Sequence, residues 1–477
     1  MQFNEPTFLF LFLPVVLAIY YAAPARWPNA RNSILLAATI FFAAWGGKQT
    51  VFILAGAVAC NGIAAVFVAR CHTVATGRWV LGLAIAANLL LLGWCKYAGF
   101  ISANLSAALT QLGLHAVQLP KLPSPPGISF VTFVAIAYLV DVFRGQAQPL
   151  KNPLHAALFF VFFSRLLAGP IVRWRDIGDQ LVRRETRREA FAYGVHRFIV
   201  GLGKKILVAT TVAGTADRIF ALPAPDLTAP LAWLGIVSYT IQLYFDFSGY
   251  TDMAIGLGAM FGFRFPENFN YPYTATSIRD FWRRWHMTLS SWLRDYLFIP
   301  LGGSRCAPAR IYMNLLVVFL VCGLWHGANW TFVFWGLFQG LFLVLERIGG
   351  ERLLETVPVA FRHGYALLVV MASFVFFRAD TLSYALGYLA AMSGLHHPVG
   401  ITDGILAFVD PPVLIALLAG VVGSMPFVPV LKAWRDKGGS LGVVMDTVTA
   451  AALAIILIAS AMFISARTYT PFIYVKF

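Results

Sequence analysis

Two histidines in the second half of the chain, His286 and His326, are the side chains best suited to proton transfer near neutral pH. His286 lies in a run, 279–296, in which arginines alternate with aromatic residues. His326 lies in a stretch, 311–345, that contains no Asp, Glu, Lys or Arg. We therefore expect one imidazole beside charged groups and the other among apolar side chains.

The setting of His326 admits two interpretations. Burying a polar group without a partner costs about 1–3 kcal/mol, so such a residue usually has a partner or a task. An ionisable side chain inside a membrane is a functional hypothesis by default. The alternative is a structural histidine that holds two helices together by hydrogen bonds.

The run 279–296 predicts a single helix. At 100° per residue its aromatic side chains fall on one side, and Arg279, Arg283, His286 and Arg294 fall on an adjacent side. Such a helix is typical of a membrane surface, with rings at headgroup depth and cations in water. His286 is then expected to face outward from the polar side.

The composition defines the class of protein. Of the 477 residues 59% are hydrophobic and 12% are charged, about half the charged fraction of a soluble protein. We predict an all-α polytopic membrane protein. The net charge is +15, with ten cations between Arg165 and Lys205 and six between Arg279 and Arg310. Since these cations flank membrane spans, we expect cytoplasmic loops that meet lipid headgroups or a phosphorylated cofactor, and no nucleic acid.

Apolar segments divide the chain into predicted spans. The alternation of Lys and Arg between the loops predicts an N-terminus outside the cytoplasm. The segment 153–170 is short for a crossing and is predicted to be re-entrant. The spans are expected near 7–25, 33–45, 50–69, 79–99, 127–142, 191–212, 228–245, 364–377, 411–431 and 447–465, with a further one near 382–392 and a long apolar passage at 311–345 that is interrupted at 325–330.

Two carboxylates, Asp246 and Asp252, lie six residues apart where the span 228–245 ends. Paired carboxylates at membrane depth can bind a metal or transfer protons. The alternative is that they cap helix ends and make hydrogen bonds between helices near a broken helix.

Three motifs resemble the signature of a known family. They are Tyr244-Phe245-Asp246-Phe247-Ser248-Gly249-Tyr250, the run from Asp280 to Asp295 continuing into Leu301-Gly302-Gly303, and Gly323-Leu324-Trp325-His326-Gly327-Ala328-Asn329. With Gly127-Ile128-Ser129-Phe130, Ala168-Gly169-Pro170 and the C-terminal Phe-Ile-Tyr, the likeness covers nearly the whole chain. The chain resembles the membrane-bound O-acyltransferase (MBOAT) superfamily, and within it the bacterial branch that O-acetylates alginate or cellulose.

The resemblance implies a single domain over 1–477, with a motif core at 240–345 and a tail at 467–477. It implies roughly 11 to 13 membrane helices, with re-entrant and interfacial helices, around a central funnel. It places the protein in a bacterial inner membrane with a periplasmic N-terminus. The expected donor is cytoplasmic acetyl-CoA, no metal is expected, and the expected partners are an extracytoplasmic acetyltransferase and a polysaccharide synthase complex.

The resemblance also assigns residues. The family's essential histidine corresponds to His326, a general base worth about 10²–10⁴-fold in rate, and its second histidine to His286. Tyr474 is a candidate acyl relay, although a terminal tyrosine also suits the interfacial belt. Ser164-Arg165 stands where relatives often have Pro-Gln or Pro-His. Candidates for binding the donor or shaping the site are Arg283, Arg284, Arg294, Trp325, Asn329, Asp246 and Ser248, and the arginines equally suit anchoring at the membrane surface.

Two other functions fit parts of the pattern. A polysaccharide transporter or flippase would also need many spans and a basic inner face, but it predicts inverted repeats, which the sequence lacks. A D-alanyl or other acyl transferase would take its acyl group from a carrier protein.

Overall fold

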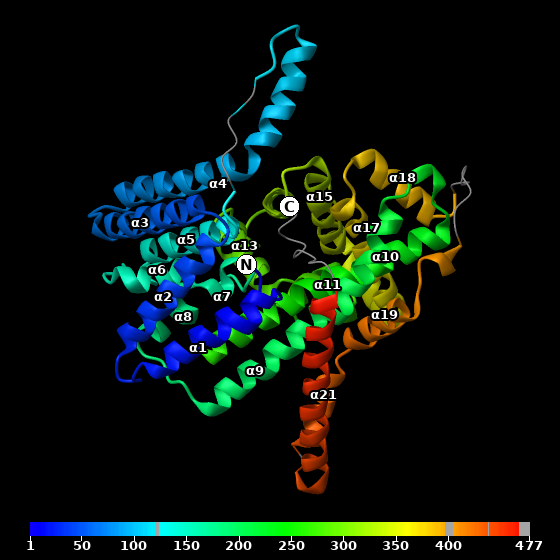
Figure 1. Ribbon diagram of the computed structural model, residues 1–477. Coiled ribbons are helices and arrows are strands. Elements are labelled where there is room, and N and C mark those ends of the chain that lie inside the picture. The colour runs from blue at the N-terminus through cyan, green and yellow to red at the C-terminus, as the bar shows by residue number, and fades with distance from the viewer. Residues whose placement is uncertain (118, 120–123, 396–403, 437, 467–477) are drawn as a thin grey trace. The chain divides into compact units, whose positions relative to one another are not determined.

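The computed structural model describes residues 1–117, 119, 124–395, 404–436 and 438–466, and this part of the chain is helical without any strand. It divides into two compact units. Unit 1 contains residues 1–195 and 254–266, and unit 2 contains residues 196–253 and the rest of the chain from 267. Figure 1 shows that both units are built from helices. The single domain that the resemblance implies stays a prediction.

Unit 1 holds the N-terminal helices. In Figure 1 the second half of α4 extends beyond the other helices of this unit. Its elements are η1 (Phe8–Phe12), α1 (Leu13–Ala22), α2 (Pro28–Ala44), α3 (Lys48–Arg70), α4 (Val74–Gln111), α5 (Ile128–Phe143), α6 (Pro153–Val161), α7 (Phe163–Leu166), α8 (Trp174–Val182), the first half of α9 (Arg188–Gly203) and the end of α11 (Ala229–Met260, from residue 254).

Two segments that are distant in the sequence meet closely inside unit 1. Gly127 directly precedes α5 and has φ 84°, a left-handed conformation that suits glycine. A Cβ at this position would lie 2.0 Å from the main-chain oxygen of Leu166. The start of α5 can therefore approach the end of α7 only because residue 127 has no side chain.

Unit 2 holds the candidate catalytic residues. Its elements are the end of α9, η2 (Lys204–Ala209), α10 (Thr210–Phe220), η3 (Ala224–Asp226), α11 (Ala229–Met260, to residue 253), η4 (Pro272–Thr274), α12 (Ile278–Arg284), α13 (Met287–Leu293), η5 (Arg294–Phe298), α14 (Pro308–His326), α15 (Trp330–Leu345), η6 (Glu346–Gly350), α16 (Glu351–Thr356), α17 (Val359–Arg378), α18 (Leu382–Met392), η7 (Ile405–Ala407), α19 (Pro411–Gly423), α20 (Phe427–Arg435) and α21 (Gly439–Ala466).

The predicted class, an all-α polytopic membrane protein, is confirmed. Seven helices of the described chain are long and apolar enough to cross a membrane, or eight if one bent pair is counted as a span. This number is lower than the 11 to 13 membrane helices expected. Part of the remaining difference comes from apolar helices of 10 to 17 residues, such as Ile128–Phe143 and Leu382–Met392. The segment Pro153–Leu166 is also short, as predicted.

Two predicted spans differ from the structure. The segment 411–431 is not one helix, because α19 and α20 meet at a 70° bend beside Pro426. The span 228–245 is helical, but α11 is not among the seven spanning candidates, since it carries buried polar residues such as Gln242 and Asp252. It continues without interruption to Met260, so the broken helix expected beside Asp246 is wrong.

Candidate active site

A tight hairpin of α14 and α15 positions His326. A Cβ on Gly323 of α14 would lie 2.2 Å from the main-chain oxygen of Phe332, and a Cβ on Gly336 of α15 would lie 2.2 Å from that of Phe319. The two helices thus approach each other through backbone, the packing that small residues allow in membrane helices. His326 is the last residue of α14, at the end of the hairpin where residues 327–329 connect the two helices.

Gly336→Ala is therefore expected to destabilise the protein by about 1–3 kcal/mol, because a main-chain oxygen cannot move aside as a flexible side chain can. The measurement is the thermal unfolding midpoint of purified protein in detergent. Gly364→Ala is the matched control, since Gly364 lies in helix α17 with nothing within 4 Å of the added Cβ. Equal midpoints for the two variants would contradict the close contact.

Aromatic rings enclose the imidazole of His326. Its ring centre lies 4.9 Å from that of Trp325, 5.0 Å from Trp335 and 5.2 Å from Phe377, each in an edge-to-face arrangement. The residue is 3% exposed. The rings come from α14, α15 and α17, so three helices exclude water from one imidazole.

The run around His286 is not the single helix that the sequence predicts. Helix α12 ends at Arg284, α13 begins at Met287, and His286 between them has φ 42° and ψ 53°. This left-handed conformation is uncommon for a residue with a side chain and costs about 1–3 kcal/mol, so the surrounding structure must hold it. The break turns the imidazole inward, and His286 is 0% exposed. The predicted outward-facing histidine is therefore wrong.

Two contacts fix α12 against α15 and η6, which follow the helix that carries His326. The carboxylate of Glu346, at the start of η6, accepts hydrogen bonds from the main-chain N–H groups of Ile278 (2.6 Å) and Arg279 (3.0 Å). A carboxylate at a helix N-terminus is favourable because it pairs with otherwise free donors. The indole N–H of Trp282 donates to Gln339 of α15 at 3.0 Å.

The structure brings the two histidines to one tryptophan. The Trp325 ring centre lies 6.1 Å from that of His286 and 4.9 Å from that of His326. Phe247 of α11 packs edge-to-face on His286 at 4.8 Å. We call the group of His286, Trp325, His326 and Trp335 the histidine cluster. Its members come from two stretches, 279–296 and 311–345, between which the sequence predicts no contact.

The segment 268–270, for which the sequence predicts no role, supports His286. The main-chain oxygen of Asn268 accepts from Met287 N–H at 2.9 Å, and Asn270 N–H donates to the oxygen of Arg284 at 2.9 Å. The side-chain Oδ1 of Asn268 lies 3.0 Å from Nδ1 of His286. The segment 268–270 thus pairs with both sides of the helix break.

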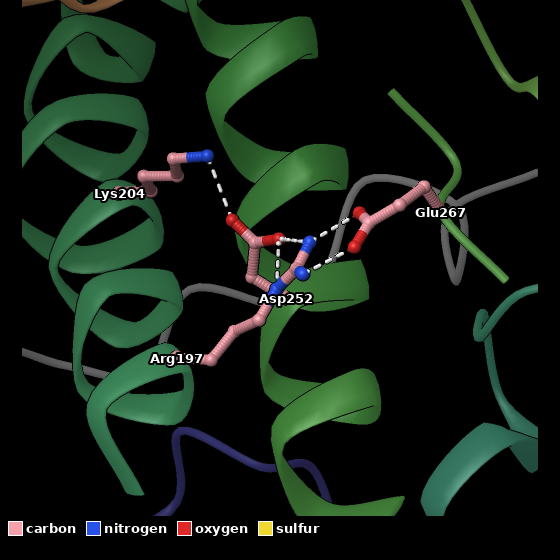
Figure 2. A network of polar contacts seen from close by, with 4 residues as sticks. All are labelled: Arg197, Lys204, Asp252 and Glu267. Atoms are coloured by element: carbon pink, nitrogen blue, oxygen red, sulfur yellow. Dashed lines mark hydrogen bonds and ion pairs between the residues drawn. The ribbon is translucent and has the colours of Figure 1, made fainter. Parts of the chain in front are cut away.

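Figure 2 shows the charged network that precedes this segment. Asp252 of α11 accepts from Arg197 at 2.8 Å and from Lys204 at 2.7 Å, and Arg197 also pairs with Glu267. Glu267 is bonded in sequence to Asn268. The carboxylate of Asp252 therefore ties two helices together, which is the helix-to-helix alternative that the sequence left open.

Asp246 likewise pairs between helices. Its carboxylate forms a salt bridge with Lys205 of η2, and the two side chains are 8% and 1% exposed. Neighbouring lysines on η2 thus hold both carboxylates of α11. The hydroxyl of Ser248 is buried and has no hydrogen-bond partner among the described residues. The donor-binding or site-shaping roles of Asp246 and Ser248 stay predictions.

The other predicted site residues lie in different settings. Arg283 is exposed, whereas Arg284 pairs with Asp280 at 2.9 Å and Arg294 with Asp295 at 2.7 Å. Asn329 caps α15, since its side chain accepts from Thr331 N–H and donates to the oxygen of Asp380. Tyr474 lies outside the described residues. No group of three or more possible metal ligands gathers within the described part of the chain.

Comparison with known proteins agrees with this architecture. A model described as "MBOAT, membrane-bound O-acyltransferase family" matches residues 141–386. The chain is 44% identical to the "Probable alginate O-acetylase AlgI" of Azotobacter vinelandii, over 82% of this chain and 78% of that protein. It is 40% identical to the protein of the same name from Pseudomonas putida over the full length of both. It is also 38% identical to the "Peptidoglycan O-acetyltransferase" of Helicobacter pylori, over 83% of this chain and 80% of that protein.

The chain therefore belongs to the membrane-bound O-acyltransferase family. It is a multi-pass membrane enzyme that transfers acyl groups to oxygen. The matched region, 141–386, contains the whole histidine cluster and both lysine-paired carboxylates.

Proposed function

We propose that the enzyme transfers an acetyl group from cytoplasmic acetyl-CoA for the O-acetylation of an exopolysaccharide such as alginate or cellulose. The names of the relatives support acetyl as the group and a polysaccharide as the final acceptor. The observation that carries the proposal is the histidine cluster, which holds two buried imidazoles against one indole ring.

In the proposed reaction a hydroxyl oxygen attacks the thioester carbonyl carbon. His326 accepts the hydroxyl proton as the new C–O bond forms, the C–S bond breaks, and the proton passes to the thiolate, giving the acetyl ester and CoA-SH. Neutral imidazole suits this role. Trp325, Trp335 and Phe377 exclude water that would otherwise hydrolyse the thioester.

The basic residues of 279–310 have distinct tasks in this proposal. Arg283 is the best candidate for a coenzyme phosphate, because it is exposed while Arg284 and Arg294 already pair with carboxylates. These loops lie on the cytoplasmic side and the N-terminus lies in the periplasm of a bacterial inner membrane. An extracytoplasmic acetyltransferase and a polysaccharide synthase complex are the proposed partners.

The test uses the purified full-length chain in lipid nanodiscs. With acetyl-CoA and oligosaccharide acceptor, release of free CoA thiol and formation of an acetyl ester are expected. If transfer occurs only from an acyl carrier protein, acetyl-CoA is not the donor and the carrier-dependent class is correct. If labelled polysaccharide crosses proteoliposomes without ester formation, a transporter is correct.

Tyr474 tests whether the acyl group is relayed by the chain's C-terminal tail. If the phenol oxygen carries the acetyl group to a partner, Tyr474→Phe abolishes polymer acetylation in cells, while CoA release to a small alcohol acceptor is unchanged. The measurement is the acetyl content of the secreted polymer. Tyr469→Phe is the matched control, since it removes the same hydroxyl from the other tyrosine of the tail and should leave acetylation intact. Full acetylation by Tyr474→Phe would exclude the relay.

A further inference from the structure

The environment of Asn268 determines which nitrogen of His286 carries the proton. Oδ1 of Asn268 lies 3.2 Å from the main-chain N of Thr288, 2.9 Å from the Thr288 hydroxyl and 3.0 Å from Nδ1 of His286. A main-chain N–H can only donate, so the atom facing it must be the amide oxygen. Turning the amide over would place two N–H donors against one another.

The proton of the imidazole follows from this orientation. The amide oxygen has no hydrogen to give, so Nδ1 of His286 must be the donor in the contact with Oδ1. In a neutral imidazole the other nitrogen then carries a lone pair. Burial lowers the pKa of His286 to about 3, so the ring is neutral at physiological pH.

The free nitrogen is buried as well. Nε2 of His286 has no hydrogen-bond partner in the described part of the chain, and the residue is 0% exposed. A buried acceptor without a donor is unfavourable, because it has lost its hydrogen bond to water. The helix break adds the cost of the left-handed backbone at His286. The fold therefore keeps an unpaired Nε2 lone pair on a ring whose centre lies 6.1 Å from that of Trp325, although both the burial and the backbone conformation are unfavourable.

We propose that Asn268 is a positioning residue that fixes His286 as the tautomer protonated at Nδ1 and holds its unprotonated Nε2 ready to accept a hydrogen bond from the hydroxyl acceptor of the reaction. The identity of that hydroxyl rests on the proposed function, the acetyl transfer. The assignment of the tautomer does not depend on it. Asn268 acts from both its main chain and its side chain, and the network of Arg197 and Glu267 anchors the residue before it.

The first test is spectroscopic and needs no turnover. Full-length protein with ¹⁵N-labelled histidine in nanodiscs is examined by solid-state NMR, and the His286 signals are assigned by their loss in His286→Gln. We expect one protonated Nδ1 and one unprotonated Nε2 at neutral pH. Asn268→Ala is expected to shift the proton to Nε2 in a measurable fraction, whereas Asn314→Ala, a buried asparagine that bonds to Leu301, leaves the signals unchanged. A protonated Nε2 in the wild-type chain would overturn the proposal.

The second test separates positioning from folding. Asn268→Asp keeps an acceptor for all three donors but adds a negative charge, which raises the pKa of His286 and protonates Nε2. Its transfer rate should be low at acid pH and rise as pH increases past the new pKa. Asn268→Ala should lower kcat about 10- to 100-fold at every pH, the range for partners that orient a ligand histidine in metal sites. A pH profile of Asn268→Asp parallel to that of the wild type would overturn the role of Asn268. If the NMR result holds and no variant or wild-type protein transfers acetyl groups, the proposed function fails and the tautomer assignment survives.

Discussion

His326→Gln is expected to lower the rate of acetyl transfer about 10²–10⁴-fold, the range for removal of a general base. Glutamine keeps a polar side chain of similar length but cannot accept a proton near neutral pH. Since the aromatic rings around position 326 come from three helices, their arrangement should persist and donor binding should change little. The loss is therefore expected in kcat and not in KM for acetyl-CoA.

His72→Gln is the matched control, because His72 is exposed and lies in the short connection between α3 and α4. It should keep the wild-type rate. The thermal midpoint of His326→Gln is measured beside its activity, so that misfolding is detected. A folded His326→Gln protein with more than about a tenth of the wild-type kcat would contradict the role of His326 as base.

Lys205→Met is expected to destabilise the protein by about 3–5 kcal/mol, because it leaves the carboxylate of Asp246 buried without its cation. Lys205 is 1% exposed, so water cannot replace the lost ammonium group. The measurement is the unfolding midpoint of the purified protein in detergent. Arg187→Met is the control, since the Arg187–Glu185 pair is 65% and 74% exposed and such pairs contribute about 0–1 kcal/mol.

The double variant Lys205→Met with Asp246→Leu tests whether removing both charges of this pair restores the stability that the single substitution loses. Replacing both charges with apolar groups is often neutral or stabilising, so most of the lost stability should return. If it returns together with transferase activity, Asp246 serves the fold. If stability returns and activity does not, Asp246 has a further role at the site. Failure of the second substitution to restore any stability would contradict the assignment of a buried pair.

The hydrophobic pattern was sufficient to predict helices and the burial of His326. The charge-free stretch 311–345 contains most of α14 and all of α15, and nothing else in the sequence was needed to place this histidine among apolar groups. Its neighbour Phe377 comes from α17 and was not predicted. Contacts between distant helices depend on side-chain packing that periodicity does not encode.

The inward turn of His286 was not predictable from local sequence. The periodicity of 279–296 favours one continuous helix, and no glycine or proline marks a break at Trp285 or His286. Asn268, 18 residues earlier, holds the break through long-range hydrogen bonds. The partners of Asp246 and Asp252 were missed for the same reason, since Lys205 and Lys204 precede them by 41 and 48 residues.

The central claim is that acyl transfer takes place at the histidine cluster. The most direct measurement is an electron cryomicroscopy structure of the full-length protein with a non-hydrolysable acetyl-CoA analogue. The proposal predicts that the carbonyl of the analogue lies against Trp325, within reach of the imidazoles of His326 and His286. An analogue bound elsewhere, with its carbonyl out of reach of both imidazoles, would contradict it.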